Sequence, residues 1–102
     1  MNRETLRSKF LGSLIGTAVG DALGASVEGW HMVAEGEVRA LAERGGLLIY
    51  TDDTHMAIGV AESLIAKRGF DGEHMAHTFI KNYDLEPFRG YGPGPPRIFR
   101  IV

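Results

Sequence analysis

The chain has 102 residues, a length suited to one domain with one modest hydrophobic core. Its 11 basic and 13 acidic residues give a formal net charge of -2, so no basic excess exists to bind a nucleic acid or an anionic membrane surface. The absence of cysteine excludes disulfides, thiolate metal sites and a cysteine nucleophile. The longest weakly polar run, Phe10 to Gly20, is too short to span a bilayer. We therefore expect a cytoplasmic protein with neither a nucleic-acid nor a membrane partner.

The first predicted helix covers Arg3 to Ala25, and Thr5 can serve as its entry cap. Glycines recur at every fourth position along it, although each interior glycine costs helix stability. Either the missing Cβ atoms let another helix approach closely, or the last two glycines leave room for a ligand. The apolar stripe consists of Leu6, Phe10, Leu14, Ile15 and Val19, and the glycines are Gly12, Gly16, Gly20 and Gly24.

The middle of the chain predicts two further helices. A short amphipathic helix over Gly36–Arg44 ends at the pair Gly45-Gly46, which suits a left-handed cap. The apolar run Leu47–Tyr50 predicts a buried connector, with a short strand as the alternative. Thr51–Thr54 then opens a helix that Lys67–Gly69 closes with a cation and a breaker.

The last part of the chain predicts one helix, a loop and the start of another helix. Asp71 caps the helix whose apolar face carries Met75, Phe79, Ile80 and Tyr83. The glycines and prolines of 86–96 predict a loop, and Pro95 or Pro96 suits the first turn of a further helix. No alternating strand pattern is present, so the fold class is all-α.

Four histidines occur in the chain, and they form no ligand pattern. His74 and His77 lie three residues apart on a predicted helix, a spacing that could bind a metal. We expect this pair to face solvent instead.

The strongest chemical signal is Thr51-Asp52-Asp53-Thr54. Carboxylates and hydroxyls are hard oxygen donors, which suit Mg²⁺, Mn²⁺ or Ca²⁺ rather than zinc. Two adjacent aspartates point in different directions from a helix start, which is compatible with a two-metal site. The alternative is structural: Thr51 or Asp52 caps the helix and the other residues decorate its first turn.

Two further features have a functional and a structural interpretation. Glu28 follows the first helix and is either a solvated surface residue or a functional group, which would act as a general base or hold a substrate hydroxyl. The loop Arg89–Gly94 combines a cation, an aromatic ring and glycines, so its backbone can approach phosphates while the ring stacks on a base or ribose. It could equally be a plain connector.

Together, three segments resemble the ADP-ribosylglycohydrolase family. They are Gly16–Glu28, Tyr50–Thr54 and Arg89–Gly94, which follow one another in the family's order and extend over most of the chain. The resemblance implies an all-α helical bundle around a pair of divalent ions, Mg²⁺ or Mn²⁺. It also implies hydrolysis of the glycosidic bond that joins ADP-ribose to a protein side chain or to a small molecule.

The resemblance also assigns roles to individual residues. Thr51, Asp52 and Asp53 match metal ligands. Glu28 matches the catalytic glutamate that assists water attack or holds the ribose, and Asp21 matches a structural position. The family's loop near the substrate corresponds to Gly90, Tyr91 and Gly92.

The chain lacks two segments of the family and differs from it at a third. The family's second motif, Asp-x-Asp-Thr/Ser, and a nucleotide-binding segment are absent, and Gly94-Pro95-Pro96 stands where Gly-Thr is common. We therefore expect residues 1–102 to form a single truncated domain, the N-terminal third of the family fold with half a metal site. The leading hypothesis is an incomplete ADP-ribosyl hydrolase. The alternative is a non-catalytic fragment that serves binding or oligomerisation. In either case the uncovered apolar faces predict a homo-oligomer.

Overall fold

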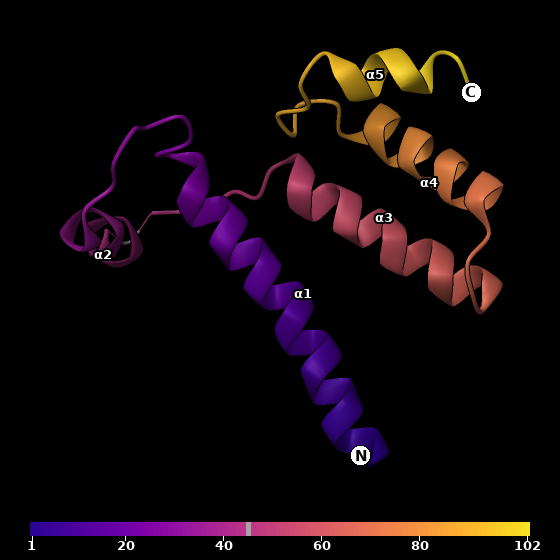
Figure 1. The fold of residues 1–102 in the computed structure, drawn as a ribbon, viewed down its shortest axis with the longest axis horizontal. Coiled ribbons are helices and arrows are strands. Elements are labelled where there is room, and N and C mark those ends of the chain that lie inside the picture. Colours follow the sequence, from indigo (N-terminus) through magenta and orange to yellow (C-terminus); the bar gives the residue numbers. More distant parts are fainter. Residues whose placement is uncertain (45) are drawn as a thin grey trace. The chain divides into compact units, whose positions relative to one another are not determined.

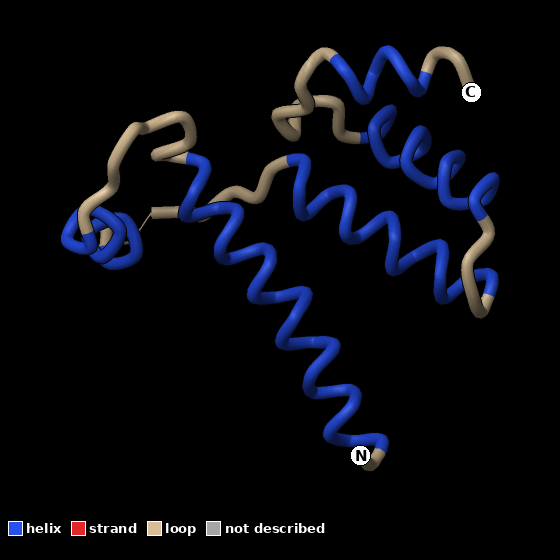
Figure 2. Tube along the Cα trace, in the orientation of Figure 1, coloured by secondary structure: helices blue, strands red, loops and turns tan. Residues whose placement is uncertain are grey.

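The computed structural model describes residues 1–44 and 46–102, and within them all regular structure is helical (Figures 1 and 2). The all-α prediction is therefore confirmed. Contacts divide the chain into two compact units, residues 1–50 and residues 51–102, which are described individually here. The first unit contains α1 (Arg3–Ala25) and α2 (Glu35–Glu43), and the second contains α3 (Asp52–Lys67), α4 (Gly72–Leu85) and α5 (Gly94–Phe99).

Helix α1 has the predicted bounds but a different cap. Asn2 takes the N-cap position, and its Oδ1 accepts from the backbone N–H of Thr5 at 2.8 Å, so Thr5 lies inside the first turn and is not the cap. The apolar stripe is exposed, with Phe10 at 67% and Ile15 at 60%. At the four glycines of α1, an added Cβ would meet no atom within 4 Å. No helix of this unit therefore packs closely against the glycine stripe.

Helix α2 begins and ends one residue earlier than predicted. The backbone N–H of Ala34, at the N-cap, donates to Glu37 Oε1 at 3.3 Å, which sets the start of the helix. Of the predicted Gly45-Gly46 cap, Gly45 lies outside the described residues. The run Leu47–Tyr50 is a connector and not a strand, as predicted, but it is not buried: Leu47 is 93% exposed.

Helices α3 and α4 form an antiparallel pair with firmly defined ends (Figure 1). Thr51 is the N-cap of α3, and Arg68 ends this helix in the left-handed conformation, with φ 55°. Asp71 caps α4 as predicted, since its Oδ1 accepts from the backbone N–H of His74 at 3.0 Å. That hydrogen bond, aided by the nearby Lys67, lowers the pKa of Asp71 below its ordinary value.

The interface between α3 and α4 is unusually polar. The Ser63 hydroxyl lies 2.7 Å from His74 Nδ1, and Asn82 Nδ2 donates to Glu62 Oε1 at 2.7 Å. His74 therefore faces α3, which corrects the prediction of a solvent-facing histidine pair; only His77 is exposed. In the described part of the chain, every buried side-chain nitrogen or oxygen has a hydrogen-bond partner. The buried polar residues are Thr54, His55, Ser63, Thr78 and Asn82.

A glycine sets the closest approach of the two helices. An added Cβ on Gly59 would lie 2.8 Å from Phe79 Cδ1 and 3.4 Å from Asn82 Nδ2. Since real Cβ atoms do not come that close to a ring carbon, the missing side chain is what lets α4 pack at this distance.

Helix α5 begins at Gly94, inside the segment predicted as loop. Pro95 lies in its first turn, as predicted, because proline needs no N–H there and its φ is already helical. The Phe99 ring packs against Tyr83 of α4, with 5.6 Å between ring centroids. None of the helices formed by residues 1–44 and 46–102 combines the length and apolar character that a bilayer crossing needs.

We expect Gly59→Ala to destabilise the chain by about 1–3 kcal/mol, because the new methyl group overpacks the α3–α4 interface. The matched control is Gly12→Ala, also within a helix but in open space, which should be neutral or stabilise by up to about 1 kcal/mol. Urea unfolding followed by circular dichroism measures both. A Gly59→Ala midpoint equal to or above that of the parent chain would contradict this packing.

Candidate functional site

The candidate metal ligands lie at the start of α3. Thr51 is half-buried at the N-cap and makes no capping hydrogen bond with its side chain. Asp52 is partly exposed and Asp53 is exposed, both within the first turn. The partial positive charge of a helix N-terminus stabilises carboxylates at this place. Thr51 therefore occupies the cap position, as the structural interpretation expects, although its side chain makes no capping hydrogen bond.

The loop before α5 meets this turn at Gly90. Its φ of +83° lies in the left-handed region, which favours glycine, and an added Cβ would lie 3.7 Å from Thr51 Cβ. The second unit therefore brings two of the three predicted motifs, Thr51–Asp53 and Gly90–Gly92, close together at Thr51 and Gly90. Nothing in the sequence spacing alone required this.

Tyr91 is the most connected side chain of the loop. Its hydroxyl lies 2.6 Å from His55 Nδ1, and the two rings meet edge to face at 5.7 Å. The same ring meets Tyr83 of α4 at 5.1 Å and Phe99 of α5 at 6.2 Å. Tyr91 thus contacts all three helices of the second unit.

Arg89, a candidate phosphate-facing cation, forms an ion pair within its own loop. Its Nε donates to Glu86 Oε1 at 2.7 Å, and the guanidinium lies 5.2 Å from the centroid of the Phe88 ring. The hydrogen bond from Arg89 lowers the pKa of Glu86 below its ordinary value, and the nearby His55 acts in the same direction. Glu86 Oε1 also lies 3.9 Å from His55 Nε2. In this structure Arg89 therefore orders the loop.

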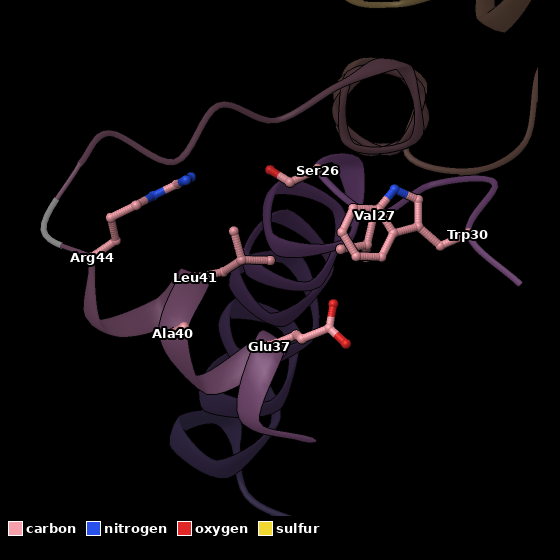
Figure 3. Close-up of a pocket in the computed structure, with 7 residues that line it drawn as sticks. All are labelled: Ser26, Val27, Trp30, Glu37, Ala40, Leu41 and Arg44. Carbon is pink, nitrogen blue, oxygen red and sulfur yellow. The ribbon is translucent and has the colours of Figure 1, made fainter. Parts of the chain in front are cut away.

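Glu28 belongs to the first unit. It is exposed in the turn that follows α1, where Gly29 adopts φ +83° and the Trp30 N–H donates to the Val27 carbonyl at 3.0 Å. Val27 and Trp30, which flank this turn, line a cavity of about 350 Å³ with residues of α2 such as Leu41 (Figure 3). Glu28 lies between Val27 and Trp30 along the chain but is not itself among the residues that line this hollow.

Sequence reasoning missed His55 and the cavity beside Trp30. The signal for His55 was present, because a residue four positions after Thr51 lies on the same face of a helix that starts there. Its backbone N–H does donate to the Thr51 carbonyl, at 3.1 Å. The loop that His55 contacts is 36 residues away, and no local pattern predicts that pairing.

The donors at the start of α3 fit a hard divalent cation in type. Two carboxylates and a hydroxyl are oxygen ligands of the kind that Mg²⁺ and Mn²⁺ prefer. In residues 1–44 and 46–102 no group of three or more His, Asp or Glu side chains is arranged to hold one ion. Within the described residues, the turn does not form a complete cation site by itself.

Comparisons with known proteins show the family to which the chain is similar. The family model described as ADP-ribosylglycohydrolase matches residues 2–100. ADP-ribosylhydrolase ARH3 of Homo sapiens is 38% identical over 105 residues, covering 91% of this chain and 29% of the relative. The Danio rerio protein of the same name is 41% identical, covering 91% and 27%. An ADP-ribosyl-(dinitrogen reductase) glycohydrolase of Rhodospirillum rubrum is 33% identical over 90 residues, covering 78% and 30%.

A family match over nearly the whole chain, together with an all-α fold, is sufficient for assignment. The chain belongs to the ADP-ribosylglycohydrolase family. It spans less than a third of the length of the curated relatives it matches.

Proposed function

We propose that this chain is part of a divalent-metal-dependent ADP-ribosyl hydrolase. The observation that carries the proposal is the contact between Gly90 and Thr51, because it joins the candidate ligand turn and the candidate substrate loop at one place. Thr51, Asp52 and Asp53 would hold Mg²⁺ or Mn²⁺, with the rest of the coordination supplied from outside this chain. The bound ions would supply Lewis-acid stabilisation of the charge that develops on the substrate.

The chain's own residues have distinct parts in this proposal. Glu28 takes a proton from the attacking water or holds a ribose hydroxyl, since an exposed carboxylate can serve as a base. The exposed backbone at Gly90 and Gly92 approaches the ribose or phosphate groups, because no side chain stands in the way. The side chain of Tyr91 is half-buried and anchors this loop by its contacts with Tyr83 and Phe99.

The reaction proposed is hydrolysis at the anomeric carbon of the distal ribose. The bond to the acceptor breaks, and water provides the new oxygen and the proton for the leaving group. The substrate class is an ADP-ribosylated protein or a small molecule that carries ADP-ribose. We further propose a cytoplasmic location and neither a nucleic-acid nor a membrane partner, in line with the net charge of -2.

The first prediction from this proposal concerns the metal. Mn²⁺ should bind the 102-residue chain weakly, because three protein ligands leave an octahedral shell mostly filled by water. Asp52→Ala combined with Asp53→Ala should abolish binding, measured by calorimetry and by Mn²⁺ paramagnetic relaxation.

The matched control removes a carboxylate elsewhere in the same unit. Asp84→Ala changes the net charge by one, at an exposed position near the end of α4, and should leave Mn²⁺ binding unchanged. Tight binding that survives the double aspartate substitution would contradict the assignment of Thr51–Asp53.

The second prediction concerns hydrolysis. The 102-residue chain alone should release no ADP-ribose from a modified protein, because its ligand set is partial. A chimera in which this chain replaces the matching segment of human ARH3 should release ADP-ribose with Mg²⁺. Glu28→Ala or Asp52→Ala in the chimera should reduce that release by at least about 100-fold, a typical loss for a removed acid–base group. A folded chimera whose activity is unaffected by both substitutions would refute the proposed roles.

A second candidate function, oligomerisation, has its own supporting observation. Large apolar side chains are exposed on elements of both units, with Phe10 at 67%, Phe88 at 72% and Ile98 at 59%. Burying one such side chain contributes roughly 1.5–3 kcal/mol, so self-association that covers several of them offsets much of the entropy lost on binding.

We therefore expect a homo-oligomer, most simply a two-fold dimer. Sedimentation equilibrium across a hundredfold range of concentration measures the association. A monomer throughout that range, with cooperative melting and no binding of an apolar dye, would contradict this second function.

A further inference from the structure

Two consecutive loop residues contact two residues that lie one helical turn apart on α3. Gly90 lies against Thr51, and Tyr91 is hydrogen-bonded to His55. The His55 N–H donates to the Thr51 carbonyl, so both contact points belong to the same turn. The loop therefore runs along the face of the first turn of α3 that carries Thr51 and His55.

From this arrangement we infer that His55 is a positioning residue, an inference that rests on the proposed function. Its imidazole holds the Tyr91 hydroxyl, and through it keeps the exposed backbone at Gly90 and Gly92 at a fixed place beside the ligand turn. His55 itself is only 5% exposed and acts through Tyr91, not on the substrate.

The geometry favours one arrangement of the protons. His55 Nε2 faces Glu86 Oε1 at 3.9 Å, which favours the tautomer with the proton on Nε2. Nδ1 then accepts from the Tyr91 hydroxyl at 2.6 Å. Glu86 is held by Arg89 at 2.7 Å, so the loop is fixed on both sides of Gly90. A partly buried network of this kind favours one arrangement of the backbone that carries it.

Tyr91 is held by the hydrogen bond of its hydroxyl and by the packing of its ring, and separate substitutions can test the two. Tyr91→Phe removes the hydroxyl but retains the ring that meets Tyr83 and Phe99. His55→Leu removes the acceptor, whereas His55→Asn keeps one near the position of Nδ1. Tyr83→Phe is the matched control, since it removes a hydroxyl from the neighbouring ring and leaves the hydrogen bond between His55 and Tyr91 intact.

The experiment measures backbone ¹⁵N order parameters at Gly90 and Gly92 in the full 102-residue chain. We expect values near 0.85 in the parent chain and in Tyr83→Phe, and values below about 0.6 in Tyr91→Phe and His55→Leu. His55→Asn should recover the order of the loop. Circular dichroism verifies that each variant keeps its helices. Equal order in the parent, Tyr91→Phe and His55→Leu chains would overturn the inference.

Adding Mn²⁺ to the same samples separates this inference from the proposed function. In the parent chain, Mn²⁺ should broaden the amide resonances of both Asp53 and Gly90. In Tyr91→Phe, broadening should persist at Asp53 and be lost at Gly90. Broadening at both amides in Tyr91→Phe would overturn the positioning role alone. No broadening in the parent chain would contradict the proposed metal site alone, because the order parameters at Gly90 and Gly92 decide whether His55 holds the loop.

Discussion

The hydrogen bond between His55 Nδ1 and the Tyr91 hydroxyl, at 2.6 Å, ties the first turn of α3 to a loop 36 residues further along the chain. The same tyrosine ring packs on Tyr83 and Phe99, so α4 and α5 share this contact. Because Gly90 precedes Tyr91, the bond also fixes the distance between Gly90 and Thr51. The candidate site of the second unit depends on this one connection.

The α3–α4 interface supports the connection with hydrogen bonds rather than with a large apolar core. The contacts between Ser63 and His74 and between Asn82 and Glu62 both join the two helices at 2.7 Å. A buried polar group costs free energy when its partner is lost, so such an interface tolerates only one register of the two helices. Gly59 adds a steric condition, because Phe79 fills the space that a side chain would need. The register of α4 in turn places the Tyr83 ring edge to face with the Tyr91 ring.

Much of the fold could be predicted from local signals. The apolar stripe predicted the bounds of α1. Arg68-Gly69 predicted the end of α3 and Asp71 predicted the start of α4, since caps and breakers act within a few residues. The N-cap of α1 was mispredicted because Asn2, one residue before the helix, accepts from the backbone N–H of Thr5 and so places Thr5 inside the first turn. The burial of His74 could not be predicted, because it depends on Ser63 in another helix.

The site could be predicted in its parts but not in its assembly. Thr51–Asp53 and Gly90–Gly92 stand out as oxygen donors and as a glycine-rich loop, yet their contact comes from long-range packing that no spacing encodes. His55 was overlooked because its spacing from Thr51 indicates only the helix face, whereas its role depends on a loop 36 residues away.

The most direct test of this account is a nuclear Overhauser measurement between the α-protons of Gly90 and the γ-methyl group of Thr51. An ideal Cβ on Gly90 would lie 3.9 Å from Thr51 Cγ2, so a detectable cross-peak is expected in the 102-residue chain. Absence of this cross-peak, in a sample that shows the contacts between α3 and α4, would mean that the ligand turn and the loop are separate, which would contradict a shared site.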